Sequence, residues 1–258
     1  MKKVLFMLAA AFLSTAASAQ IVMSRSVYKQ KRPHNTHLYI KAGAGVEGVS
    51  ALDPLYGDTD YYPSGRVHGD VKSISHFAYG ISLGIDRTIG QQGAYWAVEL
   101  GAGSHGATFE IENAYINKNG NEYLMADAKF DEPARTAFLL HLMPQLGWKF
   151  KVNDNIKIDT HIGGYFGLTL PNSDKYLQIN YIDTSVGFPA TCSINNYGYH
   201  WGNYGSELYD IGARIGAGVW IDNFNIDLSY RHGFMTMFHG AHGMAWKFLV
   251  SLGYAIPL

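Results

Sequence analysis

The chain has 258 residues, 20 Lys and Arg against 21 Asp and Glu, and a single cysteine. This length is enough for one sizeable domain, and the nearly balanced charge argues against nucleic acid as a partner. One cysteine excludes an intramolecular disulfide framework.

The first residues have the organisation of a secretory signal peptide. Lys2 and Lys3 precede an apolar stretch at 4–13 that is too short to span a bilayer as a helix. The small residues of Ala17-Ser18-Ala19 then form a signal-peptidase site. We therefore expect residues 1–19 to be a cleaved signal peptide, residues 20–36 a polar, basic periplasmic lead-in, and residues 37–258 one outer-membrane β-barrel.

From residue 37 onward, apolar side chains alternate with glycine and polar side chains, the period of a β-strand. About eight such segments occur, each about ten residues or longer, which is the length a tilted strand needs to cross the hydrocarbon layer. They are 38–47, 76–86, 95–105, 138–151, 156–169, 209–221, 224–234 and 246–256. Pro144 interrupts the fourth segment, where we expect a bulge or register kink.

One face of every segment is apolar, and the other mixes glycine with charged residues. A narrow lumen filled with charges and glycine turns the apolar face toward lipid. We interpret the inward charges as a structural salt-bridge network, because an unpaired buried charge is very costly. A narrow, gated ion path is the alternative. The network comprises Asp86, Glu99, Lys149, Asp159, Arg214, Asp227 and Arg231.

Aromatic residues on the apolar face fall near the two ends of the segments, with aliphatic residues between them. This distribution is typical of the two aromatic girdles of a transmembrane barrel. One predicted girdle comprises Trp96, Trp148, Phe150, Phe224 and Tyr254, and the other Phe77, Phe138, Phe166, Tyr209, Phe234 and Trp246.

The connections alternate in length. Those at 88–93, 152–155 and 222–223 are short, whereas those at 50–75, 110–135 and 172–208 are long. Short periplasmic turns and long outer loops are expected of outer-membrane barrels. The predicted fold is therefore all-β, an eight-stranded antiparallel transmembrane β-barrel.

Two stretches match a dinucleotide-binding fingerprint, at 43–48 and 101–106. Each lies inside an alternating strand rather than between a strand and a helix, so we predict no nucleotide and no other cofactor. Inward glycine in a crowded barrel explains both stretches.

Other residue types suggest chemistry only weakly. The inward histidines are His76, His105, His141 and His161, and the nearby hydroxyls are Ser82 and Ser104, the latter on the lipid face. A nucleophile, a base and an orienting carboxylate cannot be assembled from them, so we predict no catalytic residues.

A second set of residues lies at 232–244, where packing is favoured over a metal site. It comprises His232, Met235, Met237, His239, His242 and Met244. The 172–208 connection is rich in Tyr and Asn and carries Cys192, a composition that suits sugar or protein recognition and equally suits packing over the barrel mouth.

The strand pattern resembles that of the PorT-like outer-membrane β-barrel family of Bacteroidota. The segments that carry the resemblance include HLYIKAGAGVEG, FAYGISLGIDRTI, FNIDLSYRHGF and KFLVSLGYAIPL, within residues 37–258. The resemblance implies an outer-membrane location and, for some members, a role in secretion, with no catalytic residues to transfer. The chain ends Ile256-Pro257-Leu258 instead of in the usual aromatic residue.

The resulting prediction is a non-enzymatic outer-membrane barrel that is structural or binds a partner through its outer loops, and that assists envelope assembly or secretion. Its expected partners are outer-membrane lipid, the barrel-assembly machinery, and an envelope protein or glycan. The alternatives are a membrane-embedded enzyme that modifies lipid A, and a narrow pore.

Overall fold

The computed structural model describes residues 36–50, 55–58, 66–89, 93–118, 120–124, 126–130, 134–171, 177–182, 189–194, 209–238 and 241–258. The predicted signal peptide and nearly all of the predicted lead-in lie outside these ranges. None of the described residues forms a helix with the length and hydropathy needed to cross a membrane.

The described residues form strands in one antiparallel sheet. The strands that make the barrel are β1 (Thr36–Ser50), β4 (His76–Ile89), β5 (Ala94–Lys118), β8 (Ala134–Lys151), β9 (Ile156–Pro171), β12 (Tyr209–Ile221), β13 (Phe224–Phe238) and β14 (Ala241–Pro257). The remaining strands are shorter: β2 (Leu55–Asp58), β3 (Arg66–Ile74), β6 (Asn121–Leu124), β7 (Ala126–Phe130), β10 (Leu177–Ile182) and β11 (Pro189–Ile194).

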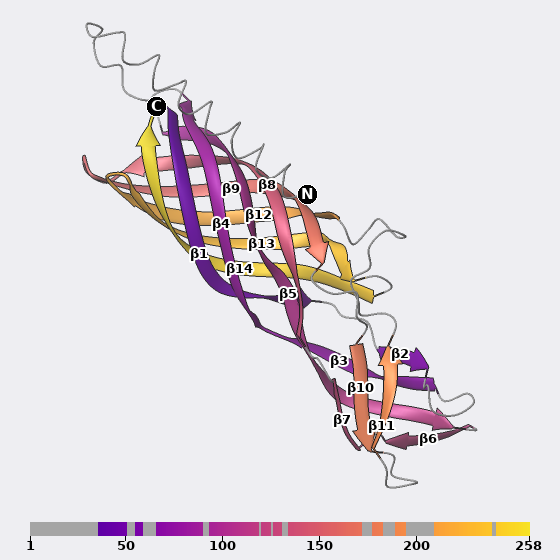
Figure 1. The fold of residues 1–258 in the computed structure, drawn as a ribbon. Helices are drawn as coiled ribbons and strands as arrows, with labels where there is room; N and C mark the ends of the chain where they lie inside the picture. The colour runs from indigo at the N-terminus through magenta and orange to yellow at the C-terminus, as the bar shows by residue number, and fades with distance from the viewer. Residues whose placement is uncertain are drawn as a thin grey trace, which may run out of the picture.

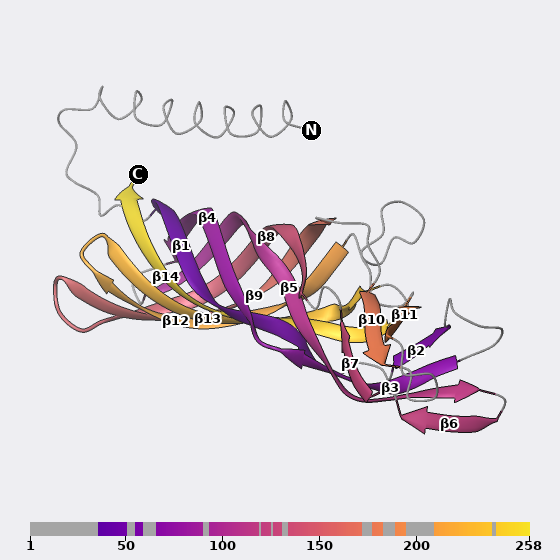
Figure 2. The same ribbon diagram turned by 60° about the horizontal axis from the view of Figure 1, so that its bottom comes forward.

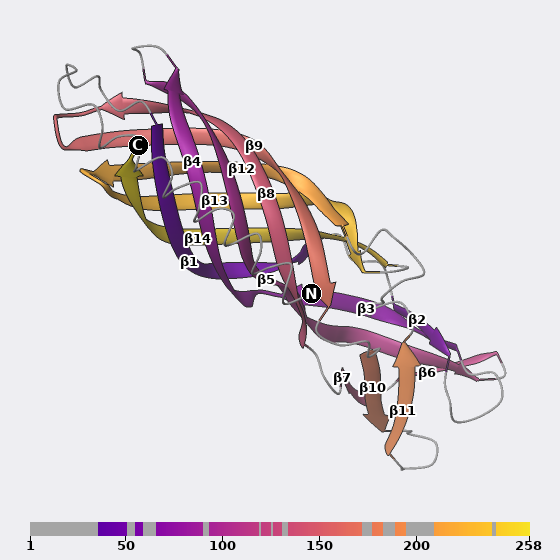
Figure 3. The ribbon, with the colours of Figure 1, turned by 45° about the horizontal axis from the view of Figure 1, so that its top comes forward.

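The barrel closes because its first and last strands pair. Each barrel strand is hydrogen-bonded to the barrel strands before and after it, and β1 pairs with both β4 and β14. The β1–β14 register runs from His37 opposite Pro257 to Ser50 opposite Met244. Strands β1, β4, β5 and β8 cross in front of β9, β12, β13 and β14 in Figure 1, and the turned views of Figures 2 and 3 show the same two tilted walls. The predicted eight-stranded antiparallel barrel is confirmed.

Alternation along each strand separates an apolar outer face from a polar lumen. In β12, Ile211 and Ile215 are 44% and 58% exposed, whereas Asp210 and Arg214 are each 5% exposed. A soluble barrel would bury its apolar residues inside, and this barrel does the reverse.

The end of the barrel where β1 starts and β14 ends is called the terminal end here. Its three connections are short: β4 to β5, β8 to β9 and β12 to β13. The tightest one places Asp222 at φ 54°, a left-handed conformation that aspartate tolerates better than most residues. A second left-handed residue, Gly93 at φ 91°, accepts a hydrogen bond from Lys149 N through its carbonyl (2.8 Å).

The opposite end, called the far end here, carries strands that we did not predict. Strand β5 runs 25 residues and continues beyond the barrel to pair with β3 and β6, while β2, β11, β10 and β7 extend the same sheet. The three long connections were predicted, but their sequences lack sustained alternation, so the short strands within them were not. Figure 1 shows these strands gathered beyond the far end.

The predicted bulge at Pro144 is wrong. Proline has no N–H to donate, so the β8–β9 ladder has no partner for residues 143 and 144. The register is nevertheless the same on both sides of this gap, with Leu142 opposite Phe166 and Gln145 opposite Gly163. On the other side of β8, Pro144 lies opposite Val98 in an uninterrupted ladder, so the strand contains the proline without a change of register.

Candidate functional site

The candidate site is the polar lumen, and Glu99 of β5 lies at its centre. Its Oε1 accepts hydrogen bonds from Tyr39 OH (3.0 Å), Lys41 Nζ (3.1 Å) and Gln145 Nε2 (2.9 Å). Its Oε2 accepts from Arg214 Nη1 at 2.8 Å. Glu99 is 1% exposed, so one carboxylate joins β1, β5, β8 and β12 in the interior of the barrel.

Asp227 of β13 completes this central group. Arg214 donates Nη2 to Asp227 Oδ1 at 3.1 Å, and Lys41 Nζ lies 3.3 Å from Asp227 Oδ2. Two carboxylates and two cations thus alternate around one point of the lumen. Such charge-assisted bonds compensate for the loss of water around each ion.

A second group lies toward the terminal end. Asp86 pairs with His37 Nδ1 (2.8 Å) and with Lys149 Nζ (2.7 Å). The same ammonium lies over the rings of Tyr95 and Trp220, 4.7 Å from each centroid. These cation–π contacts fix Lys149 where strands β4, β5, β8 and β12 meet.

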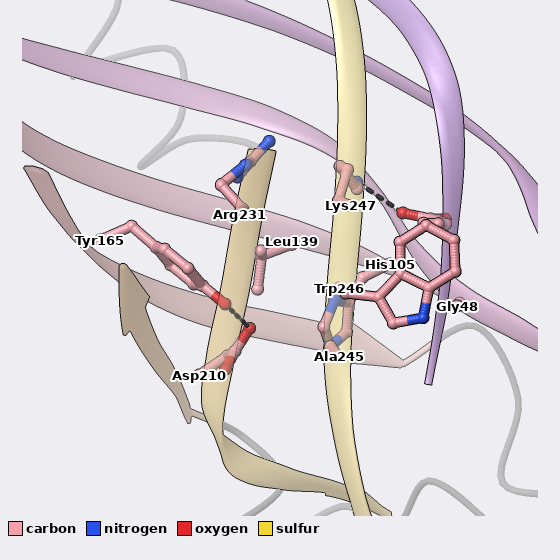
Figure 4. A pocket seen from close by; sticks show the side chains of 11 residues that line it. Gly48, His105, Leu139, Tyr165, Asp210, Arg231, Ala245, Trp246 and Lys247 are labelled. Carbon is pink, nitrogen blue, oxygen red and sulfur yellow. Dashed lines mark hydrogen bonds and ion pairs between the residues drawn. The ribbon is translucent and has the colours of Figure 1, made fainter. Parts of the chain in front are cut away.

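A third group surrounds a small cavity toward the far end (Figure 4). Lys247 forms an ion pair with Glu47 at 2.6 Å, and Tyr165 donates its hydroxyl to Asp210 Oδ2 at 2.7 Å. The guanidinium of Arg231 lies 5.7 Å from the centroid of the Tyr165 ring. This cavity and the one near Glu99 leave room for little more than a water molecule.

All seven charges of the predicted network point into the lumen. Six of them, all but Arg231, take part in a hydrogen bond or ion pair with another lumenal side chain, and Arg231 has the ring contact described above. The terminal-end and central groups are linked, because Asp159 accepts from Trp220 and Tyr95 while His161 lies between Asp159 and Asp227. Arg231 belongs to the far-end group.

Sequence reasoning left several partners out of the network. The missing charges are Lys41, Glu47, Asp210 and Lys247, and the missing neutral donors are Tyr39, Tyr95, Gln145, Tyr165 and Trp220. Alternation alone would have found them, because each lies an even number of residues from a predicted inward-facing residue of the same strand. The polar ends of Tyr and Trp explain why these large rings face the lumen.

The predicted girdle residues lie on the outer face. Two contacts connect neighbours in the terminal-end set: Trp148 with Phe150 at 6.3 Å, and Phe224 with Tyr254 at 5.1 Å between ring centroids. In the far-end set, Phe166 contacts Tyr209 at 5.9 Å. Trp246 is less exposed than the others because its ring covers Gly48 on β1, its cross-strand partner.

The candidate hydroxyls Ser82 and Ser104 are hydrogen-bonded to neighbouring groups of the barrel. Ser104 has the predicted outward parity, but it is 3% exposed, and its Oγ accepts a hydrogen bond from Tyr79 N at 3.0 Å. Lys247 Nζ lies 3.4 Å from Ser104 Oγ, bonds the Ser104 carbonyl, and forms an ion pair with Glu47. Ser82 donates to Glu99 at 3.4 Å.

The other residues discussed in the sequence have ordinary packing roles where the structure describes them. His76 bonds Thr108 at 3.2 Å, while His105 and His141 are buried. His232 stacks on Tyr230, and Met237 is buried. Cys192 lies in β11, and His239 and most of the Tyr- and Asn-rich residues fall outside the described ranges.

Glycine on the inner wall makes room for the lumenal rings, which gives a test. A Cβ at Gly147 would lie 2.5 Å from the Tyr95 ring and 2.6 Å from Thr160 O, so Gly147→Ala forces the wall or the ring to move. Overpacking of this kind costs about 1–3 kcal/mol of unfolding free energy. Urea unfolding in phospholipid vesicles measures it. Gly80→Ala is the control, because its Cβ would meet nothing closer than 3.5 Å. Equal stability of the two variants would contradict the tight packing.

Comparison with known proteins finds only low similarities. No protein-family model matches the sequence, and no curated protein matches it either. Among solved structures, Ail of Yersinia pestis, in complex with the heparin analogue sucrose octasulfate, is 11% identical with a TM-score of 0.35, covering 86% of this chain and 99% of that one. Neisserial surface protein A is 10% identical with a TM-score of 0.35, covering 86% and 97%. The outer membrane protein OprG of Pseudomonas aeruginosa is 10% identical with a TM-score of 0.37, covering 87% and 98%. Similarities of this size support no conclusion about function, and the PorT-like resemblance stays a prediction.

Proposed function

We propose that this chain is a non-enzymatic integral outer-membrane β-barrel that binds an envelope protein or glycan through its far end. The observation that carries the proposal is the inverted polarity of a closed barrel, with an aliphatic and aromatic outside around a charged inside. Such a surface is stable only in lipid, and closed barrels of this kind are the strand-based way of spanning a bilayer.

The orientation follows from the connections. In this class of protein the short turns are periplasmic and the long connections extracellular. The terminal end then faces the periplasm, and the strands at the far end lie outside the cell. Residues 1–19 would deliver the chain as a signal peptide, the barrel-assembly machinery would insert it, and residues 20–36 would lie in the periplasm.

The braced lumen argues for recognition at an end of the barrel rather than passage through it. Charges from β1, β5, β12 and β13 are paired across the lumen at its centre. A solute would have to break these pairs to pass. We therefore expect no steady conductance in planar bilayers, and stepwise ion currents from the purified chain would favour the narrow pore instead.

A capture experiment tests the binding function. The tagged chain is cross-linked in intact envelopes, purified, and compared with a variant in which residues 172–208, with β10 and β11, are replaced by a short Gly/Ser turn. Both chains must migrate differently before and after boiling, which reports a folded barrel. We expect a protein or glycan captured by the full chain to be lost from the variant. Equal capture by both would contradict binding through this segment.

The alternative of lipid A modification has its own readout. Lipid A profiles from a deletion strain, compared with the parent by mass spectrometry, are expected to be unchanged. A changed profile would overturn the non-enzymatic assignment.

A further inference from the structure

Three buried polar atoms near the terminal end of the lumen make no hydrogen bond of ordinary length within the described part of the chain. They are Asp159 Oδ1, His161 Nε2 and Asn225 Oδ1, and their residues are 2%, 4% and 1% exposed. Buried acceptors without donors are rare, and each one calls for an explanation such as a bound ion or water. Asp227 Oδ2, 3.5 Å from His161 Nε2, faces the same group.

We propose that these residues form a site for a divalent cation of the zinc class, with Asp159, His161 and Asp227 as ligands and the Asn225 amide beside them. Carboxylate oxygen and imidazole nitrogen are ligands that such cations take in proteins. One cation would supply the missing partner of both Asp159 and His161.

The distances fit this assignment. One ligand atom from each of Asp159, His161 and Asp227 can be chosen so that all three lie within 4.8 Å of one another. Tetrahedral coordination with bonds of about 2.1 Å separates ligand atoms by about 3.4 Å. The 3.5 Å between His161 Nε2 and Asp227 Oδ2 already has that length.

The surroundings hold the ligands in place, and one atom that faces the cation, Asp227 Oδ2, also lies 3.3 Å from Lys41 Nζ. Asp159 accepts from Trp220 Nε1 (2.9 Å) and Tyr95 OH (3.3 Å) through Oδ2, which leaves Oδ1 free. Asp227 is oriented by Arg214 through Oδ1. Hydrogen bonds of this kind to the ligands of a metal ion orient them and strengthen binding.

Two glycines of β12 keep the space open. A Cβ at Gly218 would lie 2.8 Å from Asp159 Oδ1 and 2.9 Å from Asn225 Nδ2. A Cβ at Gly216 would lie 2.3 Å from His161 Nε2. Any other residue at these positions would occupy the volume between the ligands, so a variant can block the site without removing a ligand.

A competing arrangement is a protonated His161 that bridges the two carboxylates without a metal. It would place a proton between His161 and each aspartate, at 3.6 Å and 3.5 Å. Metal binding distinguishes the two arrangements directly.

The test uses the refolded full barrel in detergent micelles, stripped with a chelator and dialysed against Zn²⁺ alone. We expect about one zinc per chain, with affinity lowered about 10-fold or more in His161→Gln and in Gly218→Ala. The matched controls are His141→Gln, an equally buried lumenal histidine outside the cluster, and Gly80→Ala, whose Cβ meets only ordinary contacts. Both should bind as the unchanged chain does.

All variants are first checked for heat-modifiable migration, so that loss of folding is not read as loss of the site. Crystals grown with Zn²⁺ supply a readout that needs no variant, since the anomalous signal places the metal. A peak between Asp159, His161 and Asp227 supports the proposal. Absence of binding, equal affinity in His161→Gln, or a peak elsewhere would overturn it.

Discussion

Glu99→Gln is expected to destabilise the barrel by about 3–5 kcal/mol, because it leaves a buried cation without its counter-charge. Glutamine keeps the volume of Glu99 and one acceptor oxygen, but Lys41 and Arg214 must then share the single carboxylate of Asp227. Reversible urea unfolding in phospholipid vesicles, followed by tryptophan fluorescence, measures the loss.

The double variant Glu99→Gln, Lys41→Met separates charge balance from packing. Removing Lys41 restores one cation to one anion around Arg214, so part of the lost stability should return, with a coupling between the two positions of about 0.5–3 kcal/mol. Asp154→Asn is the surface control: Asp154 contacts Lys151 at 2.6 Å in an exposed turn, and we expect little change. A Glu99→Gln barrel as stable as the parent would show that the central group does not stabilise the fold.

The second large effect is expected on the outer face. Ile215 lies midway along β12 and is 58% exposed, so Ile215→Arg places a charge where the proposal puts the centre of the bilayer. Such a substitution costs about 2–4 kcal/mol in a transmembrane barrel. The measurement is the same urea titration in vesicles, together with the yield of heat-modifiable barrel.

Ile221→Arg is its matched control on the same strand. Ile221 is the last residue of β12 and is 47% exposed, so its side chain would lie at the membrane interface, where the cost falls to about 0–1 kcal/mol. In a water-soluble barrel both substitutions would be nearly neutral. Equal small effects at the two positions would therefore contradict the membrane assignment itself.

The sequence was sufficient to predict the barrel because, on every strand, each second residue is apolar and faces outward. Alternation separated Ile215 from Arg214, and connection length separated the two ends. The far-end strands were not predictable in the same way, because β2, β6 and β7 are short. They pair with other far-end segments: β2 with β3 and β11, β7 with β10, and β6 with the extension of β5.

The sequence predicts that the lumenal charges are paired, but it does not predict which residues pair with which. Burial requires that Glu99 and Asp227 find cations, but which ones depends on the tilt and stagger of strands far apart in sequence. Asp159, His161 and Asp227 are an example, since the first two are neighbours on β9 and the third comes from β13. A sequence pattern does not show that these strands bring the three side chains together, nor that Gly218 leaves a space between them.

The link between Lys41 and Asp227 has a consequence for how the barrel is made. These residues are 186 positions apart, and Glu99 and Arg214 are 115 apart. Contacts this distant in sequence form late, since the entropy of closing the long intervening loop must be overcome first. During synthesis and insertion, we therefore expect the cations and carboxylates of early strands to stay hydrated until the late strands arrive. We expect closure to be the concerted last step of assembly, in which water leaves the interior and its ions pair together.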